Sequence, residues 1–160
     1  MLKKRPEQAI QFKRELPSFL GNGDGPVFII FNARPGGPVN PEYMAAMEQQ
    51  AMNTQVSIRQ NERIEDDASF ITADSNAAKK LSRGRLVVLF DTCVTDWQTD
   101  IVDEHDKPLA TSGAEGRQNF LELIDVKGYP EITQAILDLE KEVLEAGRIT
   151  LKNDEDVEKN

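Results

Sequence analysis

Alternating apolar and polar residues predict a β-hairpin near the start of the chain. Apolar residues recur at even steps from Ile10 to Leu16, as on one face of a strand, although Arg14 interrupts the pattern. The glycine-rich segment 21–26 is a strong loop signal, and the β-branched and aromatic run 27–31 after it is typical of a buried strand. We therefore expect two strands joined by a long loop.

A helix is expected to begin at Asn40 and Pro41, because asparagine is a good N-cap and proline suits the first helical turn. Its apolar stripe consists of Tyr43, Met44, Met47 and Ala51. In the polar stretch 53–67 that follows, Val56 and Ile58 alternate as in a short edge strand.

The middle of the chain combines strand-like and helix-like patterns. Residues 70–71 suit a strand fragment, and a helical pattern begins at Asp74 or Ser75, with Gly84 as a candidate break. The run from Leu86 to Phe90 alone suits a strand. Six apolar residues at three- and four-residue spacing nevertheless favour one helix over 86–97, and they are Leu86, Leu89, Phe90, Cys93, Val94 and Trp97.

Two amphipathic helices are predicted in the last third of the chain. Ser112 and Glu115 match a capping box, and Pro130 suits the first turn of the final helix. The buried side of the first helix consists of Phe120, Leu121, Leu123 and Ile124. The stripe of the second consists of Ile132, Ile136, Leu139 and Val143. Gly147 stands where a glycine C-cap is expected, and the charged residues 152–160 indicate a mobile tail.

These elements predict an α+β fold, in which a small N-terminal β-hairpin or sheet is followed by a mainly helical C-terminal half. We expect a β-rich part with one helix over 1–72, a helical part with an acidic turn over 73–148, and a flexible acidic tail over 149–160. A chain of 160 residues is of single-domain size.

Charge and composition exclude several classes of partner. The formal net charge of −9 disfavours binding to the phosphates of nucleic acid. No apolar run approaches the roughly 18 residues that a membrane span requires, and no secretory signal is recognisable. The basic cluster 3–5 is interpreted as a solvated arm. The one cysteine, Cys93, is expected to be a buried thiol, and we expect the protein to stay in a cytoplasm.

Candidate catalytic and metal-binding chemistry is sparse. Six carboxylates crowd one region, but they lack the spacing of a calcium loop, and they are Asp91, Asp96, Asp100, Asp103, Glu104 and Asp106. His105 lies between two acids in the expected turn 102–108, where an exposed side chain is more usual than a catalytic one. The loop 21–26 is followed by a second strand and lacks the lysine of a phosphate-binding loop. We therefore expect no metal, no cofactor and no catalytic residue.

Two features allow both a structural and a binding interpretation. Trp97 suits a core anchor, and it also suits an interface anchor, because tryptophan is enriched at binding hot spots. The apolar stripe of the last helix is equally compatible with internal packing and with docking onto another subunit.

A pattern in the second half resembles the tail assembly chaperones of long-tailed phages. Its parts are Cys93-Val-Thr-Asp-Trp97, the turn Val102-Asp-Glu-His-Asp-Lys-Pro-Leu109, and a short helix rich in phenylalanine and leucine. The resemblance covers about a third of the chain. Asp106 stands where the family has a turn glycine, and Ala110-Thr-Ser-Gly113 replaces the usual aromatic residue or proline.

The resemblance implies a non-enzymatic assembly factor in the host cytoplasm that holds the tail-tube or tape-measure protein. Acidic charge would keep such a complex soluble. The candidate protein-binding residues are Trp97, Phe120, Leu123, Ile132, Ile136, Leu139 and Val143. An alternative is a structural virion protein, such as a capsid-decorating, head–tail joining or tail subunit, that binds capsid or tail subunits or forms a homo-oligomer. A third hypothesis, an enzyme, would require a polar cleft with perturbed titratable groups.

Overall fold

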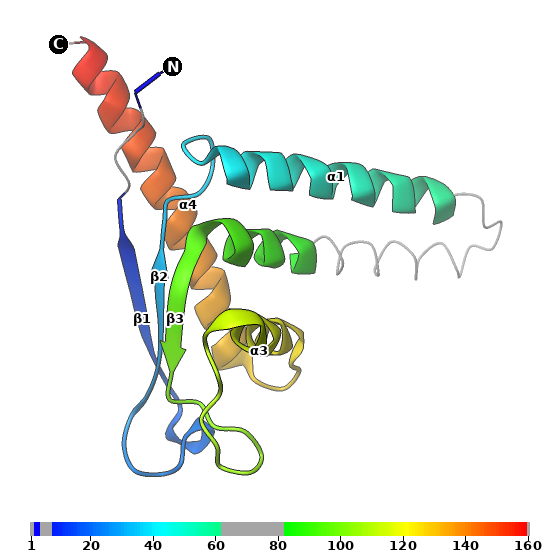
Figure 1. The fold of residues 1–160 in the computed structure, drawn as a ribbon, viewed down its shortest axis with the longest axis vertical. Helices are drawn as coiled ribbons and strands as arrows, with labels where there is room; N and C mark the ends of the chain where they lie inside the picture. The colour runs from blue at the N-terminus through cyan, green and yellow to red at the C-terminus, as the bar shows by residue number, and fades with distance from the viewer. Residues whose placement is uncertain (1, 4–7, 62–81, 160) are drawn as a thin grey trace.

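The computed structural model describes residues 2–3, 8–61 and 82–159. The elements in order are β1 (Ile10–Leu16), the short 3-10 helix η1 (Ser18–Leu20), β2 (Val27–Ala33), α1 (Pro41–Asn61), β3 (Val94–Thr99), α3 (Gly113–Asp125) and α4 (Pro130–Lys159). A further helix occupies residues 82–93 (Figure 1). The predicted α+β class is confirmed: an antiparallel sheet is followed by a mainly helical half.

The predicted hairpin is confirmed and forms two strands of a three-stranded sheet of order β1-β2-β3. Ile10 lies opposite Ala33, and Leu16 lies opposite Val27. Alternate residues of β2 are buried, as expected for a strand with one face on the core. Arg14, which interrupts the apolar pattern, lies 3.0 Å from the Asp138 carboxylate of α4 and is thereby accommodated on the inner face.

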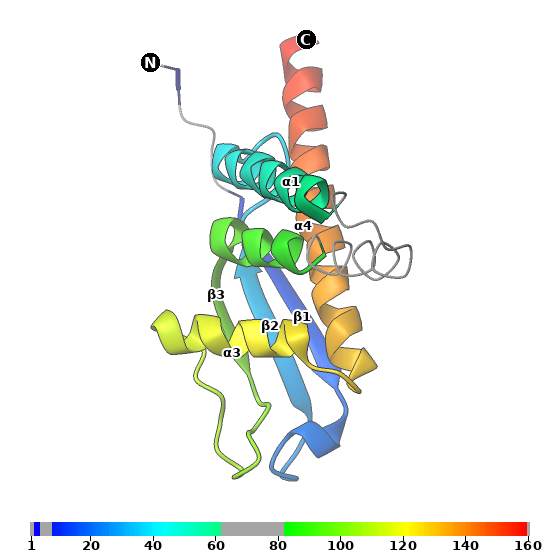
Figure 2. The same cartoon turned by 90° about the vertical axis from the view of Figure 1, so that its right-hand side faces the viewer.

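The helices cover that inner face. Helix 82–93 and α3 cross in front of the strands, and α4 runs along the side of β1 (Figure 2). The opposite face carries exposed polar residues of β1, such as Gln11 and Glu15. Within the described ranges, no helix is long and apolar enough to cross a lipid bilayer.

The strands and the helices share one hydrophobic core. At its centre, the ring of Trp97 stacks on Phe31 at a centroid distance of 5.8 Å, and Phe120 meets Phe31 edge-on at 5.8 Å. Phe90 stacks on Phe120 at a centroid distance of 4.3 Å. These four rings come from β2, β3, α3 and helix 82–93, so the described parts of both halves of the chain contribute to one core.

The prediction of one helix from Leu86 to Trp97 is wrong in its last turn. The helix ends at Cys93, and β3 begins at the next residue, Val94. Pairing with β2 places Trp97 opposite Phe31. Stacking between the two rings, together with the β-branched residues of β3, favours the strand over the local helical pattern.

Two further expectations are corrected by the helices themselves. The edge strand expected at Val56 and Ile58 is part of α1, which continues to Asn61. Helix α4 does not end at Gly147 but continues to Lys159, through the segment expected to be a tail. Gly147 serves close packing instead, because a Cβ atom there would overlap the carbonyl oxygen of Gly36. The expected elements at residues 70–71 and 74–81 lie outside the described ranges.

The structure confirms where the last two helices begin. Ser112 is the N-cap residue of α3, but its side chain makes no capping hydrogen bond, so the predicted capping box is absent. Pro130 opens α4, and the Tyr129 carbonyl accepts hydrogen bonds from the amides of Ile132 and Thr133.

Candidate functional site

The seven candidate protein-binding residues lie in the interior. All belong to the core, and the most exposed of them, Leu123, is only 7% exposed. The α4 stripe and Phe120 therefore pack internally, and Trp97 is a core anchor. In this conformation these side chains are buried, so the exposed apolar residues are the other candidates for a binding surface.

Large apolar side chains that remain exposed mark the alternatives. Among the residues whose burial the structure describes, they are Leu2, Phe19, Met44, Met52, Tyr129, Leu137 and Ile149. Two of them lie on α1. Two others, Phe19 and Tyr129, form a ring pair at the end of the sheet where β1 stops and β2 starts. Simple apolar spacing in the sequence does not identify these residues, since they are the apolar positions left outside the core.

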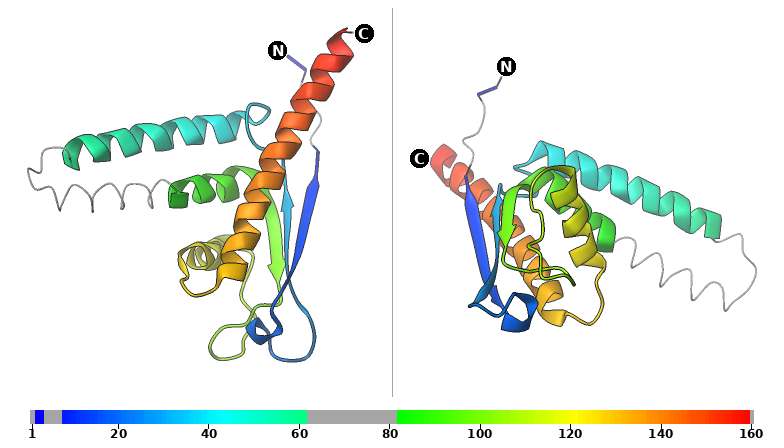
Figure 3. Two further views of the ribbon diagram at one scale, coloured as in Figure 1. Left: turned by 180° about the vertical axis from the view of Figure 1, so that it is seen from behind. Right: turned by 60° about the horizontal axis from the view of Figure 1, so that its bottom comes forward.

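Helix α1 and helix 82–93 lie side by side and extend away from the sheet (Figures 1 and 3). We call this pair the helical arm. On its inner side Tyr43 is buried, Met47 is half-buried, and Gly84 leaves room for the side chain of Gln50. The predicted α1 stripe is therefore divided, because Met44 is 45% exposed on the outside.

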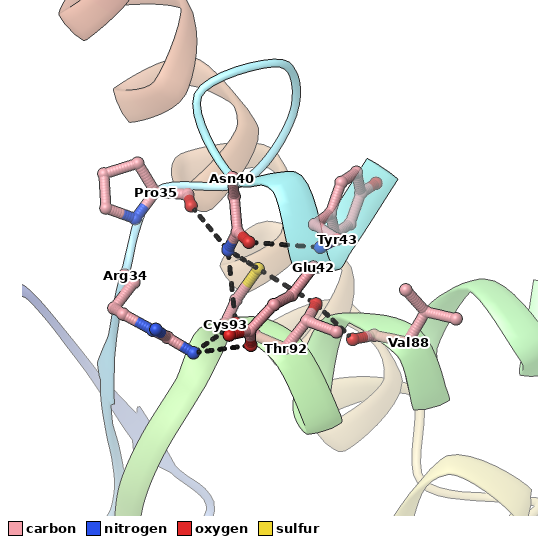
Figure 4. Close-up of polar contacts among 8 residues, drawn as sticks. All are labelled: Arg34, Pro35, Asn40, Glu42, Tyr43, Val88, Thr92 and Cys93. Carbon is pink, nitrogen blue, oxygen red and sulfur yellow. Dashed lines mark hydrogen bonds and ion pairs between the residues drawn. The ribbon is translucent and has the colours of Figure 1, made fainter. Parts of the chain in front are cut away.

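Asn40 fixes the base of the helical arm (Figure 4). Its Oδ1 accepts a hydrogen bond from the Tyr43 amide at 3.1 Å, which confirms the predicted N-cap of α1. Its Nδ2 donates to the carbonyl oxygens of Pro35 and Thr92, each at 3.2 Å. One buried side chain thus joins the first turn of α1, the segment after β2 and the last turn of helix 82–93.

The last carbonyl groups of helix 82–93 accept hydrogen bonds from Asn40 and from Arg34, the residue directly after β2. Arg34 Nη2 donates to the Thr92 carbonyl at 3.0 Å, and the Arg34 amide donates to the Cys93 carbonyl at 2.7 Å. The Arg34 guanidinium also lies 3.4 Å from Glu42 of α1. Helix ends leave carbonyl groups without intrahelical partners, and these bonds supply the partners although no glycine cap is present.

Cys93 lies inside the same junction and is a free, buried thiol, as expected. Its Sγ is 3.7 Å from Asn40 Nδ2 and 3.6 Å from Thr92 Oγ1. Burial raises the pKa of the Cys93 thiol, so it stays protonated at neutral pH. The junction is thus built to hold the helical arm in place, and its cysteine is a packed residue.

The acidic segment forms the turn expected at 102–108, closed by a bridge between Val102 and Pro108. Asp103 Oδ1 accepts hydrogen bonds from the amides of His105 and Lys107, at 2.8 and 2.9 Å. Asp106 adopts a φ of 58°, a left-handed conformation that residues other than glycine rarely adopt. The His105 side chain is exposed. Among the residues that the structure describes, no group of three or more His, Cys, Asp or Glu is placed to hold a metal ion.

The Asp103 turn should make stability depend on pH. Hydrogen bonds from the amides of Lys107 and then His105 lower the pKa of Asp103 below its ordinary 3.8. A lowered folded-state pKa contributes stability above the unfolded value, and that contribution is lost as the pH falls through the folded value. We expect Asp103→Asn to lower the urea midpoint at neutral pH and to lose this deficit in acid.

Asp24→Asn is the matched control for Asp103→Asn, because it removes one exposed loop carboxylate outside the turn. A deficit in Asp103→Asn that persists unchanged at low pH would show that the ionised carboxylate is not the stabilising species.

The exposed apolar residues that the structure describes thus include two sets at opposite ends of the sheet. The helical arm lies at the end of the sheet where β2 stops and β3 starts. The ring pair adjoins the opposite end, where β1 stops and β2 starts.

Comparison with known proteins adds no family to these observations: no protein-family model, curated protein or solved structure matches the chain.

Proposed function

We propose that the protein is a non-enzymatic binding factor that contacts its protein client through the outer face of α1. The observation that carries this proposal is the composition of that face. Met44 is 45% and Met52 56% exposed, on a helix that extends away from the core. The 21 residues of α1 include just three charged ones, Glu42, Glu48 and Arg59. A helix that serves only as a solvated surface carries more charge on its outer side.

Methionine suits this role for a physical reason. Its unbranched thioether chain adapts to irregular apolar partners, which is why methionine is common at permissive binding surfaces. The net charge of −9 would keep a complex with an aggregation-prone client soluble. Following the resemblance to phage tail assembly chaperones, we infer that the client is a tail-tube or tape-measure protein and that binding takes place in the host cytoplasm.

The test is suppression of client aggregation. The purified chain is mixed with the tail-tube and tape-measure proteins of the same genome, and aggregation is followed by light scattering. We expect suppression by the wild type. The double variant Met44→Gln/Met52→Gln should need about tenfold more protein, because each exposed contact contributes on the order of 1 kcal/mol or less.

Leu137→Gln/Ile149→Gln is the matched control, since it removes two apolar side chains of similar exposure, 37% and 46%, from α4. Equal suppression by both double variants would contradict binding through α1. Mass spectrometry of purified virions tests the role itself: an assembly factor is absent from finished particles, and a stoichiometric copy number would favour the structural virion protein.

A further inference from the structure

The end of the sheet opposite the helical arm carries an exposed aromatic pair. Phe19 of η1 is 68% exposed and Tyr129, directly before α4, is 36% exposed. Their ring centroids lie 6.4 Å apart. The two residues come from elements far apart in sequence, and neither belongs to the core. Exposure of a phenylalanine ring to water is unfavourable, and neighbouring exposed aromatic rings are typical of a contact site.

Acidic loops lie at the same end of the sheet as this pair and are held there by hydrogen bonds to η1 and β2. The Val102 amide donates to the Leu20 carbonyl at 3.0 Å, which attaches the acidic turn to η1. The Phe28 amide donates to the Asp100 carboxylate at 2.9 Å, which attaches the same segment to the start of β2. Figure 3 shows the hairpin loop, η1 and the turn gathered at one end of the molecule.

The charge at this end is predominantly negative. Segments 18–26, 100–109 and 126–129 contain five carboxylates against two lysines, Lys107 and Lys127. The exposed carboxylates include Asp24, Glu104 and Asp106. We call this surface, composed of Phe19, Tyr129 and the loops 21–26 and 100–109, the aromatic pole.

We propose that the aromatic pole docks a basic amphipathic segment of a partner protein. An apolar side chain of that segment would cover the Phe19–Tyr129 pair, and its lysines or arginines would meet the surrounding carboxylates. Cationic groups are also attracted to aromatic faces, as Lys13 shows within this chain, with its Nζ 4.3 Å from the centroid of the Phe28 ring. Complementary charge fixes the sign of the partner, because an acidic segment would be repelled from this end.

This surface is separate from the proposed client site on α1, so the two proposals succeed or fail independently. If both hold, the protein has a contact site at each end of the sheet and can bridge two partners.

The probe is a short amphipathic peptide of leucine and lysine, with a leucine–glutamate peptide of the same pattern as its control. Isothermal titration calorimetry measures affinity, and NMR amide shifts locate the bound peptide. We expect the lysine peptide to bind, to shift amides at the aromatic pole, and to weaken with added salt. Phe19→Ser should weaken binding about tenfold, as the loss of a contact hot spot does.

A matched pair of charge variants tests the electrostatic part. Asp24→Asn/Glu104→Gln removes two charges from the aromatic pole, and Glu48→Gln/Glu142→Gln removes two from α1 and α4. We expect the first variant to bind severalfold more weakly and the second to bind like the wild type. The proposal is overturned if both variants weaken binding equally, if the shifts fall on α1, if the glutamate peptide binds as well, or if no binding occurs.

Discussion

Replacing Asn40 with alanine should lower the free energy of unfolding by about 2–4 kcal/mol. The substitution removes the N-cap of α1, which contributes about 1 kcal/mol, and leaves the buried carbonyls of Pro35 and Thr92 without the Asn40 donor. A buried carbonyl that loses its only donor costs about 1–3 kcal/mol. The cost at Thr92 is smaller, because its carbonyl still accepts a hydrogen bond from Arg34. Urea denaturation followed by circular dichroism measures the loss.

A second substitution at the same position separates the two roles of Asn40. Asn40→Ser keeps an N-cap acceptor but cannot reach Thr92 as the amide does, so it should recover only about 1 kcal/mol of the alanine deficit. Asn22→Ala is the control: Asn22 accepts one exposed bond from the Asp24 amide, and its loss should cost less than about 0.5 kcal/mol. Full recovery in Asn40→Ser would show that the bond to helix 82–93 does not contribute to stability.

Gly147→Ala should destabilise the protein by about 1–3 kcal/mol, although alanine favours helices over glycine by about 1 kcal/mol. The new methyl group would overlap the carbonyl oxygen of Gly36, which is backbone and cannot rotate away. Any shift of this segment also disturbs the hydrogen bond from the Gly36 amide to the Val143 carbonyl, at 3.1 Å. The thermal unfolding midpoint, with the helical content, is the measurement.

Gly84→Ala provides the comparison within the same fold. Gly84 is also helical, but its Cβ atom would meet the end of the Gln50 side chain, which can move to another rotamer. We expect a change within about 1 kcal/mol, of either sign. If Gly147→Ala proved as stable as Gly84→Ala, the close approach of α4 to Gly36 would not be a constraint on the fold.

Local signals predicted the local elements. The hairpin, the N-cap Asn40 and the opening Pro130 depend on residues near one another in sequence, and the structure confirms each of them. The strand β3 depends on pairing with β2, more than sixty positions earlier, so the helical spacing up to Trp97 was misleading. Gly147 was misinterpreted for the same reason, because its neighbour Gly36 is distant in the sequence.

The candidate site was predictable only in part. Apolar spacing identifies side chains that avoid water, and all seven candidate residues do so. Spacing does not reveal whether the same chain covers that face, and here the sheet and helices cover it. The second role of Asn40 depends on a partner 52 positions away, and a single sequence contains no signal for that distance.

Helix 82–93 continues into β3 without an intervening residue, and Trp97 is the fourth residue of that strand. A molecule that tilts the helices on binding would therefore strain the strand that carries the chain's single indole. Stacking on Phe31 makes the emission of that indole sensitive to small displacements. Tryptophan fluorescence would thus report, without a label, the binding of a partner to the helical arm.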